Sequence, residues 1–248
     1  MSDRPEATLL DYVRIARPDH WAKHVFIVPG IAVALLLRPV SLFDRIGPIV
    51  VGFIAAAAIA SANYVLNEWL DAADDAHHPT KASRPAVATR MSPTIVFVEY
   101  VALLAVGLAL AKWISTIFFG AAIAFVVSGW VYNIPPIRTK ARPYLDVLSE
   151  ALNSPIRLTL GWSMIDGATL PPGSLLLAFW MGGAYLMGVK RFAEVRTAEF
   201  ENTTESLKLY RASFRHYTAQ SLLLSSFLYA QMAAFFLAVF LIKYRIEY

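Results

Sequence analysis

The sequence predicts an all-α, polytopic membrane bundle, and three observations support this fold class. Hydrophobic residues make up 57% of the 248 residues and charged residues only 16%, whereas an average soluble domain has about 25% charged residues. The mean hydropathy is +0.52. Long apolar runs recur along the chain without the alternation that is typical of strands. A soluble globule, a disordered chain and a disulfide scaffold are therefore excluded, the last because the chain contains no cysteine.

Seven apolar stretches are candidates for membrane helices, which need about 20 residues each. They cover residues 22–37, 46–70, 93–111, 113–134, 145–165, 174–189 and 219–242. The first is not a cleavable signal peptide, because a polar stretch precedes it and no Ala-x-Ala site follows it. We expect residues 1–248 to form one transmembrane domain with about seven membrane helices.

The connections between these stretches alternate in charge, which predicts their orientation. With a cytoplasmic N-terminus, residues 1–23, 71–92, 134–145 and 190–218 face the cytoplasm and carry 16 of the 22 Lys and Arg residues. Lys and Arg favour cytoplasmic loops, so we expect a multi-pass protein of the cell membrane whose N-terminus and active-site loops are cytoplasmic. The net charge of +4 is small and gives no reason to expect a nucleic-acid partner.

The second stretch ends in a stripe of amide and carboxylate side chains. Because four residues advance a helix by about 40°, one slowly drifting face carries Asn63, Asn67, Asp71 and Asp75. Carboxylates at a helix C-terminus oppose the macrodipole, and a bound divalent cation is the simplest compensation. The all-oxygen ligand set suits Mg²⁺, which is usually shared with a substrate phosphate. The alternative is a solvated helix end that binds nothing.

The fifth stretch repeats this pattern. A helix places four of its polar residues within an arc of about 60°, namely Asp146, Glu150, Asn153 and Arg157. Ionisable residues inside membrane segments face the bundle interior or a water-filled cavity. We therefore expect both stripes to face one cavity. A structural network in which Arg157 pairs with Glu150 is the alternative.

Basic residues occupy the loops beside both stripes. They are Lys81, Arg84, Arg90, Arg138, Lys140 and Arg142. Carboxylates, a divalent metal and basic loops together form a site for a diphosphate, whose charge needs metal bridging and neutralisation. For any single basic residue, a topology signal that contacts lipid headgroups is the simpler interpretation.

The first stripe resembles the motif of a known family. Asn67, Asp71 and Asp75, followed by HPTK at residues 78–81 and SRP at residues 83–85, are similar to the first aspartate-rich motif of the UbiA-type intramembrane prenyltransferase superfamily. In that superfamily the motif binds the donor diphosphate through Mg²⁺. The second motif resembles Tyr132, Lys140, Asp146 and Glu150 of this chain. Glu68 and Glu150 depart from the pattern, since aspartate is usual at both positions.

A narrower resemblance extends over most of the chain. It is carried by ARPDHWAKHVFIVPG at residues 16–30, YLDVLSEALNSPIRLTLGW at 144–162 and GVKRFAEV at 188–195, and by Arg211 and Tyr217. These sequences are similar to the polyprenyl-phosphate phosphoribosyltransferase branch, typified by decaprenyl-phosphate 5-phosphoribose synthase. The resemblance implies transfer of a 5-phosphoribosyl group from phosphoribosyl pyrophosphate to a polyprenyl phosphate.

The resemblance also implies roles for individual residues. Catalysis would depend on Asp71, Asp75 and Asp146, and these aspartates would hold the Mg²⁺ cofactor together with Asn67 and Glu150. Substrates would be bound by Lys23, Asn63, Lys81, Arg84, Tyr132, Lys140, Asn153, Arg157, Lys190 and Arg191. The expected partners are a phosphorylated or diphosphate donor, a polyprenyl lipid and the membrane, and the sequence is compatible with a homo-oligomer.

Two other functions remain open at this point. One is transfer of a prenyl group from a prenyl diphosphate to an aromatic or other small acceptor. The other is a non-enzymatic transporter, which would show an inverted repeat and polar residues across the midplane, whereas here the carboxylates cluster at one face. Superfamily members usually have nine transmembrane helices, so the seven expected here would leave one side of the cavity open to lipid.

Overall fold

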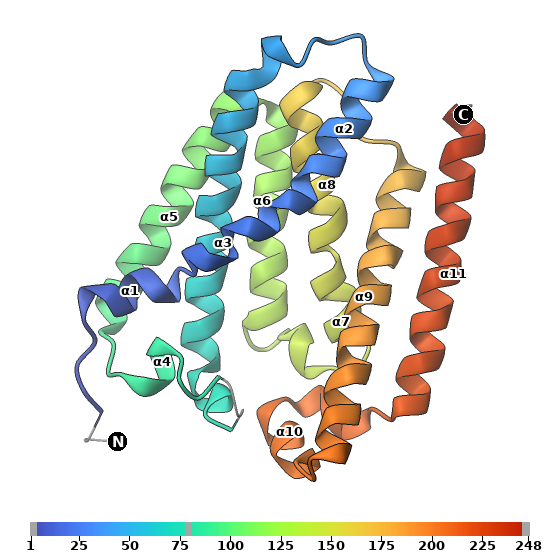
Figure 1. The fold of residues 1–248 in the computed structure, drawn as a ribbon. Coiled ribbons are helices and arrows are strands. Elements are labelled where there is room, and N and C mark those ends of the chain that lie inside the picture. Colours follow the sequence, from blue (N-terminus) through green and yellow to red (C-terminus); the bar gives the residue numbers. More distant parts are fainter. Residues whose placement is uncertain (1–3, 78–80, 245–248) are drawn as a thin grey trace.

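The computed structural model describes residues 4–77 and 81–244. The described residues form α-helices and short 3₁₀ helices, without a β-strand; a single β-bridge joins Glu6 to Arg90. Figure 1 shows long helices running side by side, with the short helices α4 (Pro85–Ala88) and α10 (Thr204–Tyr210) at one end of the bundle. This arrangement confirms the predicted all-α fold class.

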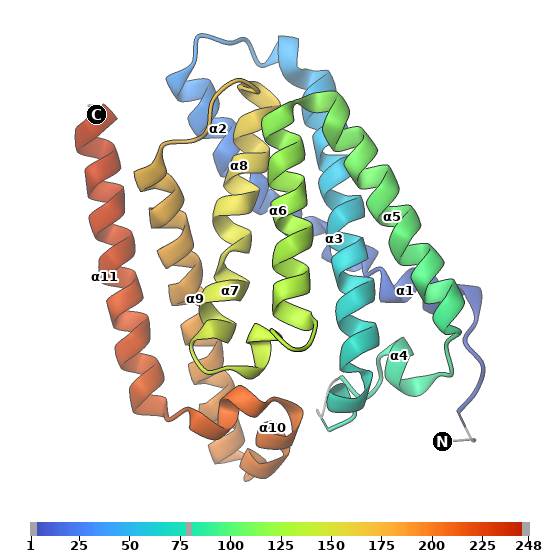
Figure 2. The same ribbon diagram turned by 180° about the vertical axis from the view of Figure 1, so that it is seen from behind.

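Seven helices form the body of the bundle. They are α2 (Val28–Leu37), α3 (Ile46–Asp75), α5 (Pro93–Ile114), α6 (Thr116–Asn133), α8 (Asn153–Ile165), α9 (Gly173–Phe200) and α11 (Ala219–Tyr244). In both views α5 and α11 lie on opposite sides (Figures 1 and 2). α3 packs against α5 and α6, whereas α8 packs against α2, α6 and α9. The carboxylate-bearing elements are therefore brought together through α6 and α8.

Five helical stretches of the described chain are long and apolar enough to cross a membrane. They are Leu9–Leu37, Phe43–Asp75, Pro93–Ile114, Thr116–Asn133 and Ala219–Tyr244. The other two expected segments exist as helices but with different limits, since 145–165 is divided and 174–189 lies within the longer α9. The membrane bundle is thus confirmed, and seven crossings remains a prediction.

The fifth expected segment is divided into α7 (Leu145–Ala151) and α8. Pro155 has no N–H, so the carbonyl of Ala151 lacks its helical donor and the helix is interrupted at Leu152. Leu152 itself keeps right-handed helical angles, with φ of −56° and ψ of −23°. In the described chain, Arg191 and not Arg157 pairs with Asp146 and Glu150.

The first expected segment is also irregular. Before α2 the chain forms α1 (Leu9–Ile15) and the 3₁₀ helix η1 (Pro18–Ile27), and Arg17 between them has a left-handed φ of 54°. Two glycines allow α2 and α8 to pack closely, as small residues do between membrane helices. A Cβ on Gly30 would lie 2.1 Å from the carbonyl oxygen of Leu158, and one on Gly161 would lie 2.1 Å from that of Ile27. This contact fixes η1 beside the first turns of α8.

Candidate active site

The two carboxylate stripes lead to the same end of the bundle, where the C-terminus of α3, the loop before α7 and the segment containing α10 meet. A cavity of about 190 Å³ lies there. Its wall is formed by Asp71, Asp74, Arg138, Lys140, Ala141, Leu209, Tyr210, Arg211, Ala212 and Arg215. Most of these side chains are polar or charged. The cavity therefore suits a small, strongly charged ligand.

Asp71 connects α3 to the basic loop after α6. Its Oδ1 accepts hydrogen bonds from Lys140 Nζ and, at 3.2 Å, from Arg138. Its Oδ2 accepts one from Asn67 Nδ2 at 3.1 Å. Arg138 also pairs with Asp74 at 2.6 Å. The structure thus brings Asn67 and Asp71 of the first stripe together with Lys140.

Asp75 lies one turn further along α3 and is completely buried. Its Oδ2 accepts a hydrogen bond from Arg84 at 2.5 Å, but its Oδ1 has no hydrogen-bond partner among the described residues. A buried carboxylate oxygen without a partner is costly, and a cation would satisfy it. The pair Asp71 and Asp75 therefore fits Mg²⁺, which is commonly held by one or two carboxylates and completes its shell with water and substrate phosphate.

The metal would depend on such extra ligands, because no group of three or more His, Asp or Glu residues in the described chain is arranged to hold an ion by itself. Asn67 also donates to Asn133 Oδ1 at 2.5 Å. Its amide nitrogen is thus engaged, and its carbonyl oxygen is the atom that could join the metal shell. Residues 78–80 of the family motif lie outside the described residues.

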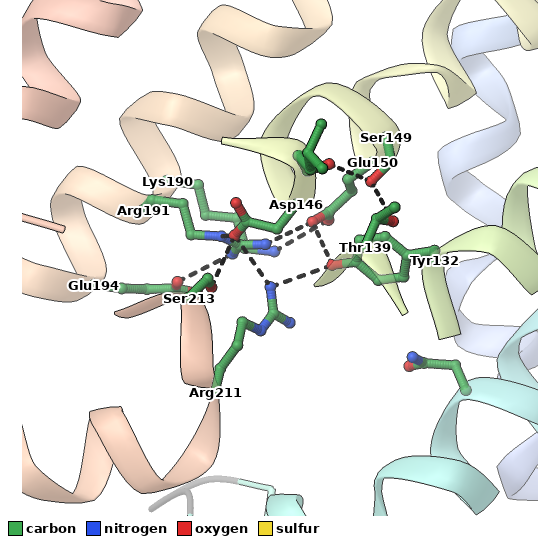
Figure 3. Close-up of polar contacts among 12 residues, drawn as sticks. Tyr132, Thr139, Asp146, Ser149, Glu150, Lys190, Arg191, Glu194, Arg211 and Ser213 are labelled. Carbon is green, nitrogen blue, oxygen red and sulfur yellow. Dashed lines mark hydrogen bonds and ion pairs between the residues drawn. The ribbon is translucent and has the colours of Figure 1, made fainter. Parts of the chain in front are cut away.

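Asp146 forms a second centre, which Figure 3 shows to be filled by donors from other elements. Its carboxylate is completely buried. It accepts hydrogen bonds from Arg191 Nε at 3.0 Å, from Ser213 at 3.2 Å and from the Tyr217 hydroxyl. These donors come from α9 and from the segment after α10, so three distant parts of the chain converge on one carboxylate.

Glu150 shares the same arginine. It accepts hydrogen bonds from Arg191 Nη2 at 2.7 Å and from the Tyr132 hydroxyl at 2.9 Å, and Lys190 lies 3.7 Å away (Figure 3). Arg191 is only 1% exposed and also pairs with Glu194 at 3.1 Å.

The expectation that Asp146 and Glu150 hold a metal stays a prediction. In the described chain the buried Arg191 guanidinium bridges both carboxylates, and hydroxyl donors occupy further lone pairs. The alternative pairing of Arg157 with Glu150 is not formed, since Arg191 takes that place.

Arg211 links the Asp146 centre to the cavity. Its Nη1 lies 3.2 Å from the Tyr132 hydroxyl and 3.9 Å from Asp146 (Figure 3). Its Nη2 lies 3.2 Å from the Tyr210 hydroxyl. Lys81 Nζ donates to the same Tyr210 hydroxyl.

Burial lowers the pKa of Lys81 to about 8, and it also lowers the pKa of Lys140 to about 8. Both lysines therefore gain from an anionic ligand that stabilises their charge.

Four predicted substrate residues lie elsewhere. Lys23, Asn63, Asn153 and Arg157 have no hydrogen bond or ion pair with Asp71 or Asp146 in the described part of the chain. Asn63 donates to the Phe125 carbonyl at 3.0 Å, and Asn153 begins α8 after the break.

Several contacts at the site have no signal in the sequence pattern. Asn133 at the end of α6 and Ser213 in the 3₁₀ helix η4 (Ala212–His216) follow no stripe. Arg138 and Tyr144 adopt positive φ angles of 31° and 63°, a strain that is commonly found at functional sites. Tyr144 N–H donates to the Tyr217 hydroxyl at 2.6 Å. Only the family resemblance pointed to Tyr217 and Arg211.

The chain resembles several curated proteins. A lycopene elongase/hydratase of Haloarcula japonica is 25% identical over 198 residues, which are 79% of this chain and 64% of that protein. A decaprenyl-phosphate phosphoribosyltransferase of Corynebacterium glutamicum is 26% identical over 206 residues, which are 77% of this chain and 57% of that protein. The chain thus spans less than two thirds of the length of either relative.

A solved structure shares the fold. The UbiA homologue from Archaeoglobus fulgidus bound to GPP and Mg²⁺ superposes with a TM-score of 0.74 at 23% identity, over 94% of this chain and 78% of that one. In addition, the model of the UbiA prenyltransferase family matches residues 26–245. This match covers most of the chain, including both centres and the cavity between them. The chain therefore belongs to the UbiA prenyltransferase family.

Proposed function

We propose that this chain transfers a 5-phosphoribosyl group from phosphoribosyl pyrophosphate to a polyprenyl phosphate in the membrane, with Mg²⁺ as cofactor. The observation that carries this proposal is the wall of the 190 Å³ cavity, which contains Arg138, Lys140, Arg211 and Arg215 but few apolar side chains. A prenyl chain needs an apolar wall. A sugar with phosphates at both ends needs cations on several sides.

The relatives agree with this reaction. The protein from Corynebacterium glutamicum is named a decaprenyl-phosphate phosphoribosyltransferase, and so is a relative from Mycolicibacterium smegmatis that is 25% identical over 85% of this chain. The homologue from Archaeoglobus fulgidus was solved with Mg²⁺. Together with the unpartnered oxygen of Asp75, this supports Asp71 and Asp75 as the residues that hold the metal.

The remaining residues bind and orient the reactants. When bound, Mg²⁺ would neutralise charge that develops on the departing diphosphate. Lys140, Arg138 and Arg84 surround the two aspartates and would bind the diphosphate oxygens. An oxygen of the acceptor phosphate forms the new bond to ribose C1 while the bond from C1 to the diphosphate oxygen breaks, and the diphosphate leaves with the electron pair. The attacking oxygen is already anionic, so no general base is required.

Asp146 would act through other residues. It and Glu150 hold Arg191 in place, and Arg211 extends from this network toward the cavity. We assign Asp146, Glu150 and Tyr132 to positioning the basic wall that receives the donor. The site opens at the end of the bundle whose loops are rich in Lys and Arg, which supports a cytoplasmic face for the reaction.

Prenyl transfer from a prenyl diphosphate to a small acceptor is the second candidate. It is favoured by the lycopene elongase/hydratase relative and by the homologue bound to GPP. Both reactions release diphosphate, so the aspartates would serve either one. The two reactions differ in the group that is transferred.

A direct assay distinguishes them. Purified protein is incubated with Mg²⁺ and either labelled phosphoribosyl pyrophosphate plus decaprenyl phosphate, or labelled geranyl diphosphate plus an aromatic acceptor. We expect label to enter the lipid phosphate in the first mixture only. Transfer in the second mixture alone would establish the prenyl reaction, and transfer in neither would contradict both. The variant Arg14→Gln is a matched control, because Arg14 is exposed and pairs only with Asp11 among the described residues.

A further inference from the structure

A second basic cluster lies away from the cavity, where η1 crosses α3 and α8. We call Arg17, Lys23, His24, Tyr64 and Arg157 the Tyr64 cluster. η1 packs against both helices, and the close contact of Gly30 with Leu158 holds it beside Arg157.

Tyr64 lies at the centre of this cluster. The Arg17 guanidinium lies 5.9 Å from the centre of the Tyr64 ring. His20 meets the same ring edge-on at 5.0 Å, and Lys23 Nζ lies 3.3 Å from the His20 ring nitrogens. Arg157 interacts with the Tyr64 hydroxyl and lies 5.7 Å from the centre of the Phe125 ring. Aromatic rings, and not carboxylates, are thus the main partners of these cations.

The positive charge of the cluster is not compensated. Within the described chain, neither Lys23 nor Arg157 forms an ion pair, whereas Arg84, Arg138 and Arg191 at the other two centres are all paired with carboxylates. Arg17, Lys190 and Arg157 repel the charge of Lys23, whereas the exposed Asp19 attracts it. Arg157 lies within α8, where a cation without a counter-charge is costly, and an anion would relieve it.

Buried polar atoms in the same place also lack partners. His24 is 6% exposed, and neither of its ring nitrogens has a hydrogen-bond partner among the described residues. The same is true of Arg157 Nε and Asn63 Oδ1. Buried groups of this kind are normally satisfied. An oxyanion could accept from Arg157 and from a protonated nitrogen of His24 at once.

The cluster is separated from the metal site along the membrane axis. Tyr64 precedes Asp71 by seven residues on α3, which is about 10 Å along a helix. Two anionic groups could therefore be bound at the same time, one at Asp71 and one beside Tyr64, with the reacting carbon between them.

We propose that the Tyr64 cluster binds the phosphate of the acceptor lipid, and that Lys23 and Arg157 provide its charge. This inference rests on the proposed function, since it assigns the acceptor to a subsite of the same bundle. A polyprenyl monophosphate combines one anionic head with a long apolar tail. It matches a cationic cluster on η1, whose Trp21, Val25 and Phe26 are exposed where lipid would surround the helix.

The test measures binding without catalysis. The full chain in detergent is titrated with farnesyl monophosphate, farnesol and inorganic phosphate, in the absence of Mg²⁺ and donor. We expect farnesyl monophosphate to bind more tightly than the other two. Lys23→Gln and Arg157→Gln should weaken its binding about 10- to 100-fold, as loss of a charge-assisted hydrogen bond does. Farnesol binding should not change.

Controls separate binding from folding. Arg157→Lys keeps the charge and should retain most of the affinity, Arg14→Gln should behave as the unmodified chain, and thermal unfolding is recorded for every variant. Equal affinity of the unmodified chain and both Gln variants for farnesyl monophosphate would overturn the proposal. Inorganic phosphate that binds as tightly as farnesyl monophosphate would overturn the lipid assignment. Because no donor is present, the binding result does not depend on whether phosphoribosyl transfer is correct.

Discussion

The Asp71 and Asp146 centres contain similar residues but differ in how completely they are satisfied. The Asp146 carboxylate accepts hydrogen bonds from a buried arginine, a serine and a tyrosine. At the other centre an oxygen of the buried Asp75 has no partner among the described residues, and Asp71 lines a cavity. One centre is complete without a ligand and the other is not. Carboxylates in a membrane bundle are therefore not equivalent. The groups around each carboxylate decide whether it is available to a ligand or only holds other side chains in place.

The largest expected effect is on catalysis at the incomplete centre. Asp71→Asn or Asp75→Asn removes a carboxylate charge that we propose binds the metal, without changing the shape of the side chain. Either variant should lower Mg²⁺-dependent turnover about 10²- to 10³-fold, the usual scale for one electrostatic catalytic contact. Thermal stability should change little, because the lysine left beside Asp71 can lose its proton. Turnover is measured with and without EDTA. Undiminished Mg²⁺-dependent activity in Asp71→Asn would exclude this aspartate as a metal ligand.

Substitution at the Asp146 centre should change the stability of the protein more than substitution at Asp71 does. Asp146→Asn removes one of the three carboxylates that Arg191 contacts, and loss of a buried hydrogen bond to a charged group costs about 1.5–3 kcal/mol. The free energy of unfolding in detergent should fall by that order, more than in Asp71→Asn. If Asp146→Asn instead keeps its stability and loses only activity and Mg²⁺ dependence, Asp146 is a metal ligand, as the family resemblance implies.

A pH titration separates the lysines from the arginines of the cavity. Burial lowers the pKa of both Lys81 and Lys140 to about 8, so both are charged below this pH and lose charge as pH rises through it. Donor affinity should accordingly be constant below about pH 7 and fall above about pH 8. Lys140→Arg should move the fall to higher pH. An affinity that is unchanged up to pH 10 would show that neither lysine contacts the donor.

The smallest effect is expected at the opposite end of the bundle. Arg38 pairs with Asp166 at 2.7 Å and lies 5.1 Å from the Trp162 ring. Hydrogen bonds from Thr169 and Arg38 outweigh burial and lower the pKa of Asp166 to about 2, so its contribution to stability is present above its ordinary pKa of 3.8 and is lost as pH falls through 2. Asp166→Asn should cost about 1–2 kcal/mol at neutral pH. Turnover should stay unchanged, and a loss of turnover would connect this end to the site.

Much of the fold could be predicted from local pattern. The length of the apolar stretches predicted the helical bundle, and polar residues at intervals of four predicted the stripe that ends at Asp75. The pattern failed at residues 145–165, because it treats Pro155 as one more apolar position, although the missing N–H breaks the helix at Leu152. It also could not place Arg191 on Asp146, since 45 residues separate them.

The sequence by itself determined a helical membrane protein with two stripes of acidic and amide side chains, because composition and periodicity are local properties. Only the tertiary structure decided that one acidic stripe borders a charged cavity while the carboxylates of the other share Arg191. It also decided that Lys23 and Arg157 form a separate cationic cluster around Tyr64. The physical reason is that the free energy of a buried charge depends on the groups that surround it, and packing brings these together from distant parts of the chain.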